Sequence, residues 1–161
     1  MSGLILLGLI VIPSFAAAQK LPVDSIKREI LAAHNIARSR AGVPPMTWSD
    51  SLAAFAQQWA NSLVRSGKFV HRPESGHGEN LFEIRGGKAV PSQVVQNWVD
   101  EEKDYQPSTN TCKAGAECGH YTQVVWKASL YVGCARAGNS AREVWVCNYD
   151  PPGNWLGERR F

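Results

Sequence analysis

The four cysteines constrain the fold of this chain through the disulfides that they can form. They are Cys112, Cys118, Cys134 and Cys147. An even number favours two disulfides, and four cysteines allow three pairings. A bridge from Cys112 to Cys118 would close a small loop over Gly115. Cys134 and Cys147 lie in two apolar, β-like runs, where a cross-strand bridge is geometrically reasonable. A zinc site made of four cysteines is disfavoured, because the chain contains no Cys-x-x-Cys pair.

The first 18 residues have the pattern of a secretory signal peptide. Leu4 to Ile12 is an apolar run that is too short to span a bilayer. Ala16-Ala17-Ala18 then forms an Ala-x-Ala cleavage site before Gln19, although the residues ahead of the apolar run carry no lysine or arginine. We therefore expect residues 1–18 to be removed and residues 19–161 to be secreted, with no membrane span, into an oxidising compartment.

Length and composition favour one packed domain. The chain has 161 residues, of which 44% are hydrophobic and 19% are charged, a balance that is typical of a globular core. The net charge is only +3 and the sequence contains no run of lysine and arginine, so a nucleic-acid partner is not expected.

The spacing of apolar residues predicts both helices and strands. Apolar residues recur at intervals of three and four in the helical segments, and alternate in the strand segments. The expected helices run from a cap at Asp24 or Ser25 to about Arg40, from a cap at Ser49 or Asp50 to Gly67, from Pro91 and Ser92 onward, and over His120 to Trp126. The expected strands are Glu79 to Ile84 and the antiparallel pair Tyr131 to Ala137 and Glu143 to Tyr149. Helices on both sides of the strand segments indicate three layers.

Four side chains are candidates for a divalent metal site. They are His71, Glu79, Glu101 and His120, and two imidazoles with two carboxylates suit an ion such as zinc. A histidine must be neutral to bind a metal, so the affinity should fall below about pH 6. The alternative is a cleft of hydrogen-bonded polar residues without an ion, because the four are scattered along the chain and none belongs to a His-Glu-x-x-His motif.

Nucleophilic catalysis has little support in the sequence. There is no Gly-x-Ser-x-Gly motif and no phosphate-binding glycine loop. The cysteines are assigned to disulfides, and Thr122 beside His120 is typical of a residue that hydrogen-bonds within a helix. His34 and Arg38 lie one turn apart on the first expected helix, where we interpret them as a surface or inter-element polar contact. The six tryptophans are expected to lie mostly in the core.

Four motifs follow one another along the chain. They are His34-Asn35-Ile36-Ala37-Arg38, Gly78-Glu79-Asn80-Leu81, Gly119-His120-Tyr121-Thr122-Gln123-Val124-Val125-Trp126 and Val146-Cys147-Asn148-Tyr149-Asp150-Pro151-Pro152-Gly153-Asn154. In this order the chain resembles the CAP superfamily, which comprises cysteine-rich secretory proteins, antigen five and plant pathogenesis-related group-one proteins. The resemblance extends from about Ile26 to the C-terminus. It implies an α+β fold, a three-layer α-β-α sandwich with a large central cleft, in a short single-domain protein.

The resemblance also implies a set of site residues. The family cleft holds two histidines and two glutamates, and family members can bind zinc through the histidines. By motif, His120 and Glu79 occupy two of these positions. His71, ahead of the Gly-Glu-Asn motif, and Glu101, three residues after Trp98, occupy the other two. His77 is a rival to His71 and Glu102 is a rival to Glu101.

Disulfides and lipid contacts follow from the same resemblance. Plant members usually carry three disulfides, and here two family cysteine positions are vacant, one near Gly67 and one in the loop 138–142. The remaining bridges are then Cys112–Cys118 and Cys134–Cys147. The loop that is associated with sterol binding in the family corresponds to residues 98–107, in which Trp98 and Tyr105 are the aromatic candidates and the other side chains are largely charged.

The resemblance favours a secreted defence or host-interaction protein without catalytic activity, whose cleft is able to bind a divalent metal or a lipid such as a sterol or fatty acid. An unknown protein receptor is a further expected partner. One alternative is a zinc-dependent hydrolase, a peptidase, in which Glu79 or Glu101 would act as base. The other is an extracellular carrier of sterol or lipid. The segment Pro151 to Phe161 corresponds to a defence peptide that plant members release.

Overall fold

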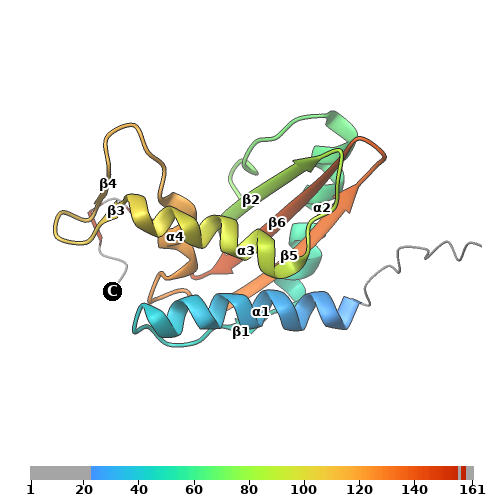
Figure 1. Ribbon diagram of the computed structural model, residues 1–161. Coiled ribbons are helices and arrows are strands. Elements are labelled where there is room, and N and C mark those ends of the chain that lie inside the picture. Colours follow the sequence, from blue (N-terminus) through green and yellow to red (C-terminus); the bar gives the residue numbers. More distant parts are fainter. Residues whose placement is uncertain (1–22, 156, 159–161) are drawn as a thin grey trace, which may run out of the picture.

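A four-stranded sheet forms the centre of the structure (Figure 1). The computed structural model describes residues 23–155, 157 and 158, so the expected signal peptide and the last three residues lie outside the described part. The strand order is β1-β5-β6-β2, with β1 Thr47–Trp48, β2 Gly78–Arg85, β5 Tyr131–Gly138 and β6 Arg142–Asp150. β6 pairs antiparallel with both β5 and β2, whereas β1 runs parallel to β5.

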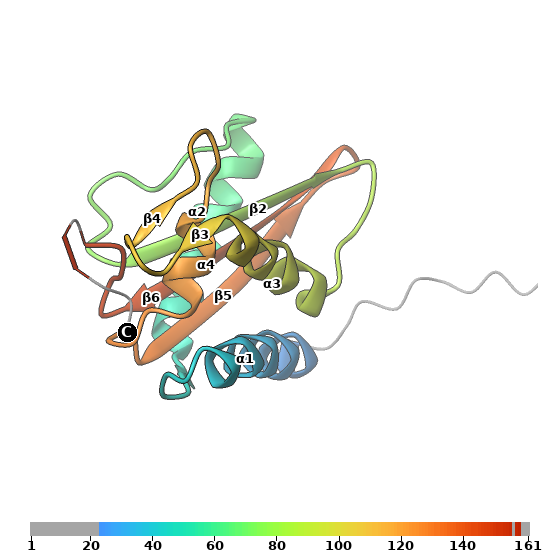
Figure 2. The same cartoon turned by 60° about the vertical axis from the view of Figure 1, so that its left-hand side comes forward.

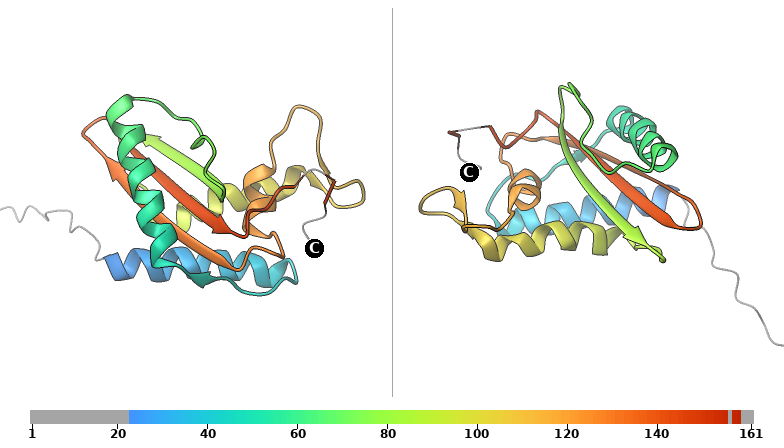
Figure 3. Two further views of the ribbon diagram at one scale, coloured as in Figure 1. Left: turned by 180° about the vertical axis from the view of Figure 1, so that it is seen from behind. Right: turned by 90° about the horizontal axis from the view of Figure 1, so that it is seen from above.

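Helices cover both faces of this sheet. α2 (Asp50–Ser66) lies along one face, as the rear view in Figure 3 shows. α1 (Val23–Arg40), α3 (Pro91–Val99) and the short α4 (Gly119–Val124) lie on the other (Figures 1 and 2). The architecture is the expected α+β sandwich of three layers. Within the described residues, no helix combines the length and the apolar character that crossing a membrane requires.

Each face of the sheet has its own hydrophobic core. Along β6, Val144 and Val146 pack in the cluster under α2, while Trp145, Cys147 and Tyr149 pack in the cluster under α1 and α3. The alternation follows from the pleat of a strand, whose successive side chains point to opposite faces. β6 is buried from Arg142 to Tyr149 because helices cover both faces of the sheet.

Local signals set the ends of α2 as the sequence predicts. The side chain of Ser49, the N-cap residue, accepts a hydrogen bond from the backbone N–H of Leu52 at 3.2 Å. Gly67 ends the helix with φ of 70°, a left-handed conformation that glycine adopts without steric cost. For α1 the predicted cap is wrong, because the helix already includes Val23 and both Asp24 and Ser25 lie inside it.

Residues 103–117, for which the sequence predicts no helix or strand, contain short regular elements. The 3₁₀ helix η1 (Asp100–Asp104) leads into a hairpin of β3 (Tyr105–Gln106) and β4 (Thr111–Cys112). The Cys112–Cys118 disulfide then ties this hairpin to the start of α4. The second bridge joins Cys134 and Cys147, which face each other across β5 and β6. Both pairings are those that the family resemblance implies.

Candidate functional site

A cleft of about 430 Å³ lies where β2, the start of α4 and the disulfide-closed loop meet. Its walls are formed by His71, Glu79, Asn80, Cys112, Ala116, Glu117, Cys118, Gly119, His120 and Asn154. Three of the four candidate ligands, namely His71, Glu79 and His120, are therefore on its surface. The fourth, Glu101, contacts His120 directly. The structure brings the four candidates together as two histidine–glutamate pairs.

The first pair joins the loop after α2 to β2. Nδ1 of His71 lies 2.8 Å from Oε1 of Glu79, and the same oxygen accepts the backbone N–H of Arg72 at 3.0 Å. Glu79 is nearly buried whereas His71 is exposed. The hydrogen bond to Glu79 raises the pKa of His71 above its usual value, against the opposite effect of partial burial. Oε2 of Glu79 is buried and has no hydrogen-bond partner among the described residues.

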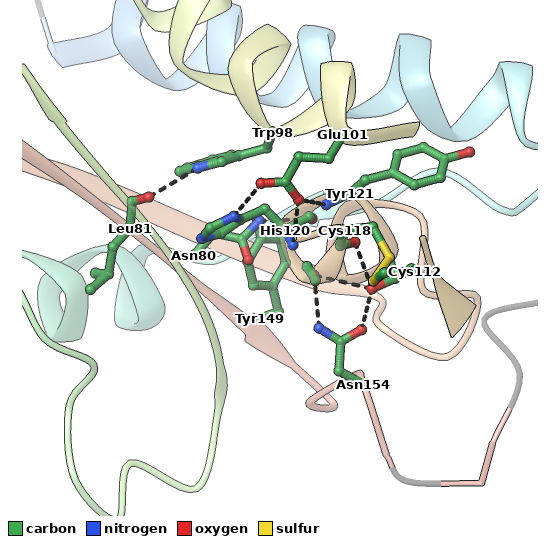
Figure 4. Close-up of polar contacts among 12 residues, drawn as sticks. Asn80, Leu81, Trp98, Glu101, Cys112, Cys118, His120, Tyr121, Tyr149 and Asn154 are labelled. Carbon is green, nitrogen blue, oxygen red and sulfur yellow. Dashed lines mark hydrogen bonds and ion pairs between the residues drawn. A yellow bond between two sulfur atoms is a disulfide. The ribbon is translucent and has the colours of Figure 1, made fainter. Parts of the chain in front are cut away.

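The second pair joins η1 to the first turn of α4 (Figure 4). Nδ1 of His120 lies 2.6 Å from Oε1 of Glu101. Oε2 of Glu101 accepts two backbone N–H groups, those of His120 at 3.0 Å and Tyr121 at 3.2 Å. One carboxylate therefore holds both the side chain and the backbone of the histidine. The indole ring of Trp98 lies nearly parallel to the imidazole, at 20° and 6.3 Å between centroids.

A chain of hydrogen bonds links the backbone of His120 to buried side chains of β2, β6 and α1. The side-chain amide of Asn80 donates to the backbone oxygen of His120 at 3.1 Å and to the Tyr149 hydroxyl at 3.2 Å. The Tyr149 hydroxyl lies 3.0 Å from Nε2 of His34, whose Nδ1 lies 2.8 Å from the backbone oxygen of Ile30. Burial lowers the pKa of His34 to about 4, so the ring is neutral and its Nε2 accepts a hydrogen bond from the Tyr149 hydroxyl. Burial raises the pKa of Tyr149 for the same reason.

The segment that follows β6 contributes Asn154 to the wall of the cleft. The side chain of Asn154 donates to the backbone oxygen of Gly119 at 2.8 Å and accepts the Thr122 hydroxyl at 2.7 Å (Figure 4). The backbone N–H of Gly153 donates to the side chain of Gln123 at 3.0 Å. Thr122 and Gln123 thus hold the segment that follows β6 against α4, which assigns them a scaffold role.

The structure separates the candidates from their rivals in the sequence. Glu101 rather than Glu102 faces His120, because Glu102 instead accepts the hydroxyl of Tyr121 at 2.7 Å. His71 rather than His77 lines the cleft. His77 packs edge-on against Phe55, at 5.1 Å between ring centroids, in a separate cavity.

The two aromatic candidates for lipid contact are buried. Trp98 is 1% exposed and donates its indole N–H to the backbone oxygen of Leu81 at 3.0 Å. Tyr105 is 8% exposed and its hydroxyl donates to the side chain of Asn110 at 2.7 Å. Tyr105 borders a cavity of about 270 Å³ together with Trp126 and Trp155. Lipid binding stays a prediction from the resemblance.

The sequence did not single out three of the residues that build the cleft. Asn80, Tyr149 and Asn154 belong to the recognised motifs, yet their roles depend on contacts between segments that lie far apart in the chain. For His34 the sequence allowed a polar contact at the surface or between elements. The structure shows a contact between elements, because the side chain is completely buried and meets Tyr149 of β6.

The three layers and the pair of histidine–glutamate contacts in a disulfide-bounded cleft define a small α-β-α domain of the cysteine-rich secretory class. The model of the cysteine-rich secretory protein family, CAP, matches residues 31–149. The chain belongs to this family.

Plant pathogenesis-related proteins are among its relatives. Pathogenesis-related protein 1A of Nicotiana tabacum is 46% identical over 136 residues, which cover 84% of this chain and 80% of that protein. Pathogenesis-related leaf protein 4 of Solanum lycopersicum is 47% identical over 135 residues, 83% of this chain and 82% of the relative. The PR-1 type protein of Sambucus nigra is 43% identical over 153 residues, which cover 94% of this chain and 89% of that protein. The chain is thus of the pathogenesis-related, defence type within the family.

Solved structures share the fold at lower sequence identity. The crystal structure of NaASP2 with Zn²⁺ superposes with a TM-score of 0.71 at 22% identity, covering 86% of this chain and 85% of that one. The crystal structure of MpPR-1i superposes with a TM-score of 0.63 at 22% identity, covering 85% of this chain and 95% of that one.

Proposed function

We propose that the chain is a secreted, non-catalytic defence protein whose cleft binds a divalent ion, with zinc as the best fit, between His71 and His120. The carrying observation is that a glutamate occupies Nδ1 of each histidine, at 2.8 Å from Glu79 and 2.6 Å from Glu101. In metal sites a carboxylate commonly holds one ring nitrogen and orients the other toward the ion. The ligand atoms would then be Nε2 of each ring.

This arrangement revises the role expected of the glutamates. A carboxylate that is hydrogen-bonded to an imidazole positions the ring, and Glu101 has both oxygens engaged. Glu79 differs, because its buried Oε2 has no partner among the described residues, and an unpaired buried carboxylate oxygen is suited to a cation. No group of three potential ligands lies within metal-binding distance in the described residues. We therefore expect weak binding by the two histidines and water, with Oε2 of Glu79 as the one carboxylate oxygen that is free to approach the ion.

The experiment that tests this proposal is calorimetric titration of zinc into the folded protein at pH 7.5. We expect binding by the wild type and loss of binding in the His71→Ala/His120→Ala double variant. His77→Ala is the matched control, because that ring lies in another cavity. Unchanged zinc binding in the double variant would place the site elsewhere, and equal loss in the control would indicate unspecific binding to histidines.

The unpaired Oε2 of Glu79 also supports the alternative of a zinc-dependent hydrolase, because a general base needs an oxygen that is not already engaged. The measurement is peptide hydrolysis by the zinc-loaded protein. A hydrolase would lose turnover in Glu79→Gln, which keeps the shape of the side chain. Peptide hydrolysis that persists in this variant would come from a contaminating protease. If the zinc-loaded wild type hydrolyses no peptide, the result supports the non-catalytic function.

A further inference from the structure

A second cavity, of about 400 Å³, lies apart from the histidine–glutamate cleft. It is lined by Ser49, Ser51, Leu52, Phe55, His77, Tyr131 and Asp150, none of which borders the cleft. The first turns of α2, the first residue of β5 and the last residue of β6 supply most of these side chains. Its volume falls in the range of about 300–1,000 Å³ that is typical of small-molecule sites.

One polar atom of this cavity is buried without a hydrogen-bond partner among the described residues. This atom is Nδ1 of His77. The nearest carboxylate oxygen, Oδ1 of Asp150, is 3.8 Å away, which is too far for a hydrogen bond. The hydroxyls of Ser49 and Ser51 lie 2.8 Å apart at the start of α2. Hydroxyl and imidazole groups both donate and accept, so the cavity suits a ligand that does the same.

The charges around the cavity disfavour an ionic ligand of either sign. The half-exposed carboxylate of Asp150 repels an anion. A cation is disfavoured at the Phe55 ring, because the guanidinium of Arg72, although outside the cavity lining, lies 3.7 Å from the centroid of that ring and repels the cation. The N-terminal end of α2 adds a partial positive charge. What remains is a neutral polar ligand.

An exposed aromatic ring supplies the apolar part of the site. Tyr131 is 46% exposed at the rim of the cavity, whereas most large apolar side chains of the domain are buried. A sugar ring combines hydroxyls at its edge with an apolar face of C–H groups, which packs against an aromatic ring. We propose that this cavity binds a neutral sugar unit at the end of a glycan, with Tyr131 against the ring face and His77, Asp150 and the α2 serines at its hydroxyls.

The test is titration of the full chain with neutral trisaccharides, namely laminaritriose, cellotriose and N,N′,N″-triacetylchitotriose, followed by saturation-transfer NMR and calorimetry. At least one of them should bind. Tyr131→Ala should weaken that binding about tenfold, the effect of a lost ring contact together with apolar area, while Tyr131→Phe keeps the ring and the binding. Asp150→Asn, which preserves shape, should also weaken it.

Leu130→Ala is the matched control, because Leu130 is equally exposed beside Tyr131 but does not line the cavity. The proposal is overturned if none of the trisaccharides binds, or if Tyr131→Ala and Leu130→Ala have the same effect. It is also overturned if glucosamine or glucuronate, the charged analogues, binds in preference to the neutral sugar. None of these outcomes depends on zinc, so the test is independent of the proposed function of the cleft.

Discussion

Arg38 shows how one buried cation organises several segments. Its side chain is completely buried, and no carboxylate of the described residues forms an ion pair with it. It donates instead to backbone oxygens, among them those of Pro44 at 2.6 Å, Trp126 at 2.8 Å and Ser129 at 3.0 Å. The fixed fork of a guanidinium can reach several carbonyl groups at once. Burial lowers its pKa to about 10, which still leaves it charged at neutral pH.

His34, one turn earlier than Arg38 on α1, makes the free energy of unfolding depend on pH. Its pKa is about 4 in the folded state, compared with about 6.5 in the unfolded chain. The unfolded state therefore binds the proton first as the pH falls. The stabilisation is complete above pH 6.5 and is lost progressively down to pH 4, by about 3 kcal/mol in total. Urea unfolding at pH 7 and pH 4 measures this loss.

The variant His34→Gln isolates this effect from the other titrating groups. It keeps a polar side chain but removes the proton-binding ring. Between pH 7 and pH 4 the free energy of unfolding should fall less in this variant than in the wild type. The difference between the two falls should be about 3 kcal/mol, the contribution of His34. Parallel pH profiles for the two proteins would show that His34 does not titrate in this way.

The contact between α2 and β5 depends on a glycine. A Cβ atom on Gly133 would lie 2.2 Å from the backbone nitrogen of Ala53 and 2.5 Å from the backbone oxygen of Ser49. Both atoms belong to the first turn of α2, where backbone cannot move aside without moving the helix. A side chain at this position would therefore separate helix and strand.

We expect Gly133→Ala to reduce the free energy of unfolding by about 3 kcal/mol or more, the upper range for overpacking. Gly87→Ala is the control, because its new Cβ would lie 3.4 Å from the end of the flexible Ile84 side chain. Thermal or urea unfolding of both variants measures the difference. A Gly133→Ala protein as stable as the control would mean that α2 does not approach β5 this closely.

Long periodic segments could be predicted from the sequence, whereas two-residue strands could not. α2 begins and ends where Ser49 and Gly67 predict, because caps and helical periodicity are local. β1 and the β3–β4 hairpin are too short to show any period, and they exist because a partner strand lies beside them. In the same way, chain spacing could not separate His71 from His77, since both belong to one loop and only its path sends them to different cavities.

Across the domain, Arg142 connects the two regions where the family resemblance leaves cysteine positions vacant. Its guanidinium donates to the backbone oxygens of Gly67 at 2.9 Å and Lys68 at 2.8 Å. Its Nε also lies 3.0 Å from a carboxylate oxygen of Glu83. The side chain is 6% exposed. A buried polar clamp thus joins the end of α2 to the start of β6 without a covalent bond.

We expect Arg142→Ala to destabilise the domain by about 3 kcal/mol, because it leaves two carbonyl groups without their donor and removes the buried cation beside Glu83, which keeps only the exposed Arg85. Arg85→Ala is the matched control. Arg85 pairs with the same oxygen of Glu83 at 3.1 Å but is exposed, so its loss should cost about 1 kcal/mol at most. Urea unfolding with both disulfides intact compares them. Equal losses would argue against the clamp.

The sequence by itself determined the family, the order of the long helices and strands, and a set of candidate histidines and glutamates for the cleft, because motifs and periodicity depend on neighbouring residues. Only the tertiary structure decided which glutamate faces which histidine and that the glutamates hold Nδ1. It also decided that His34 and Arg38 are buried and that His77 belongs to a separate cavity. These properties depend on contacts between segments far apart in the chain, and such contacts form only when the sheet and its two helical layers pack together.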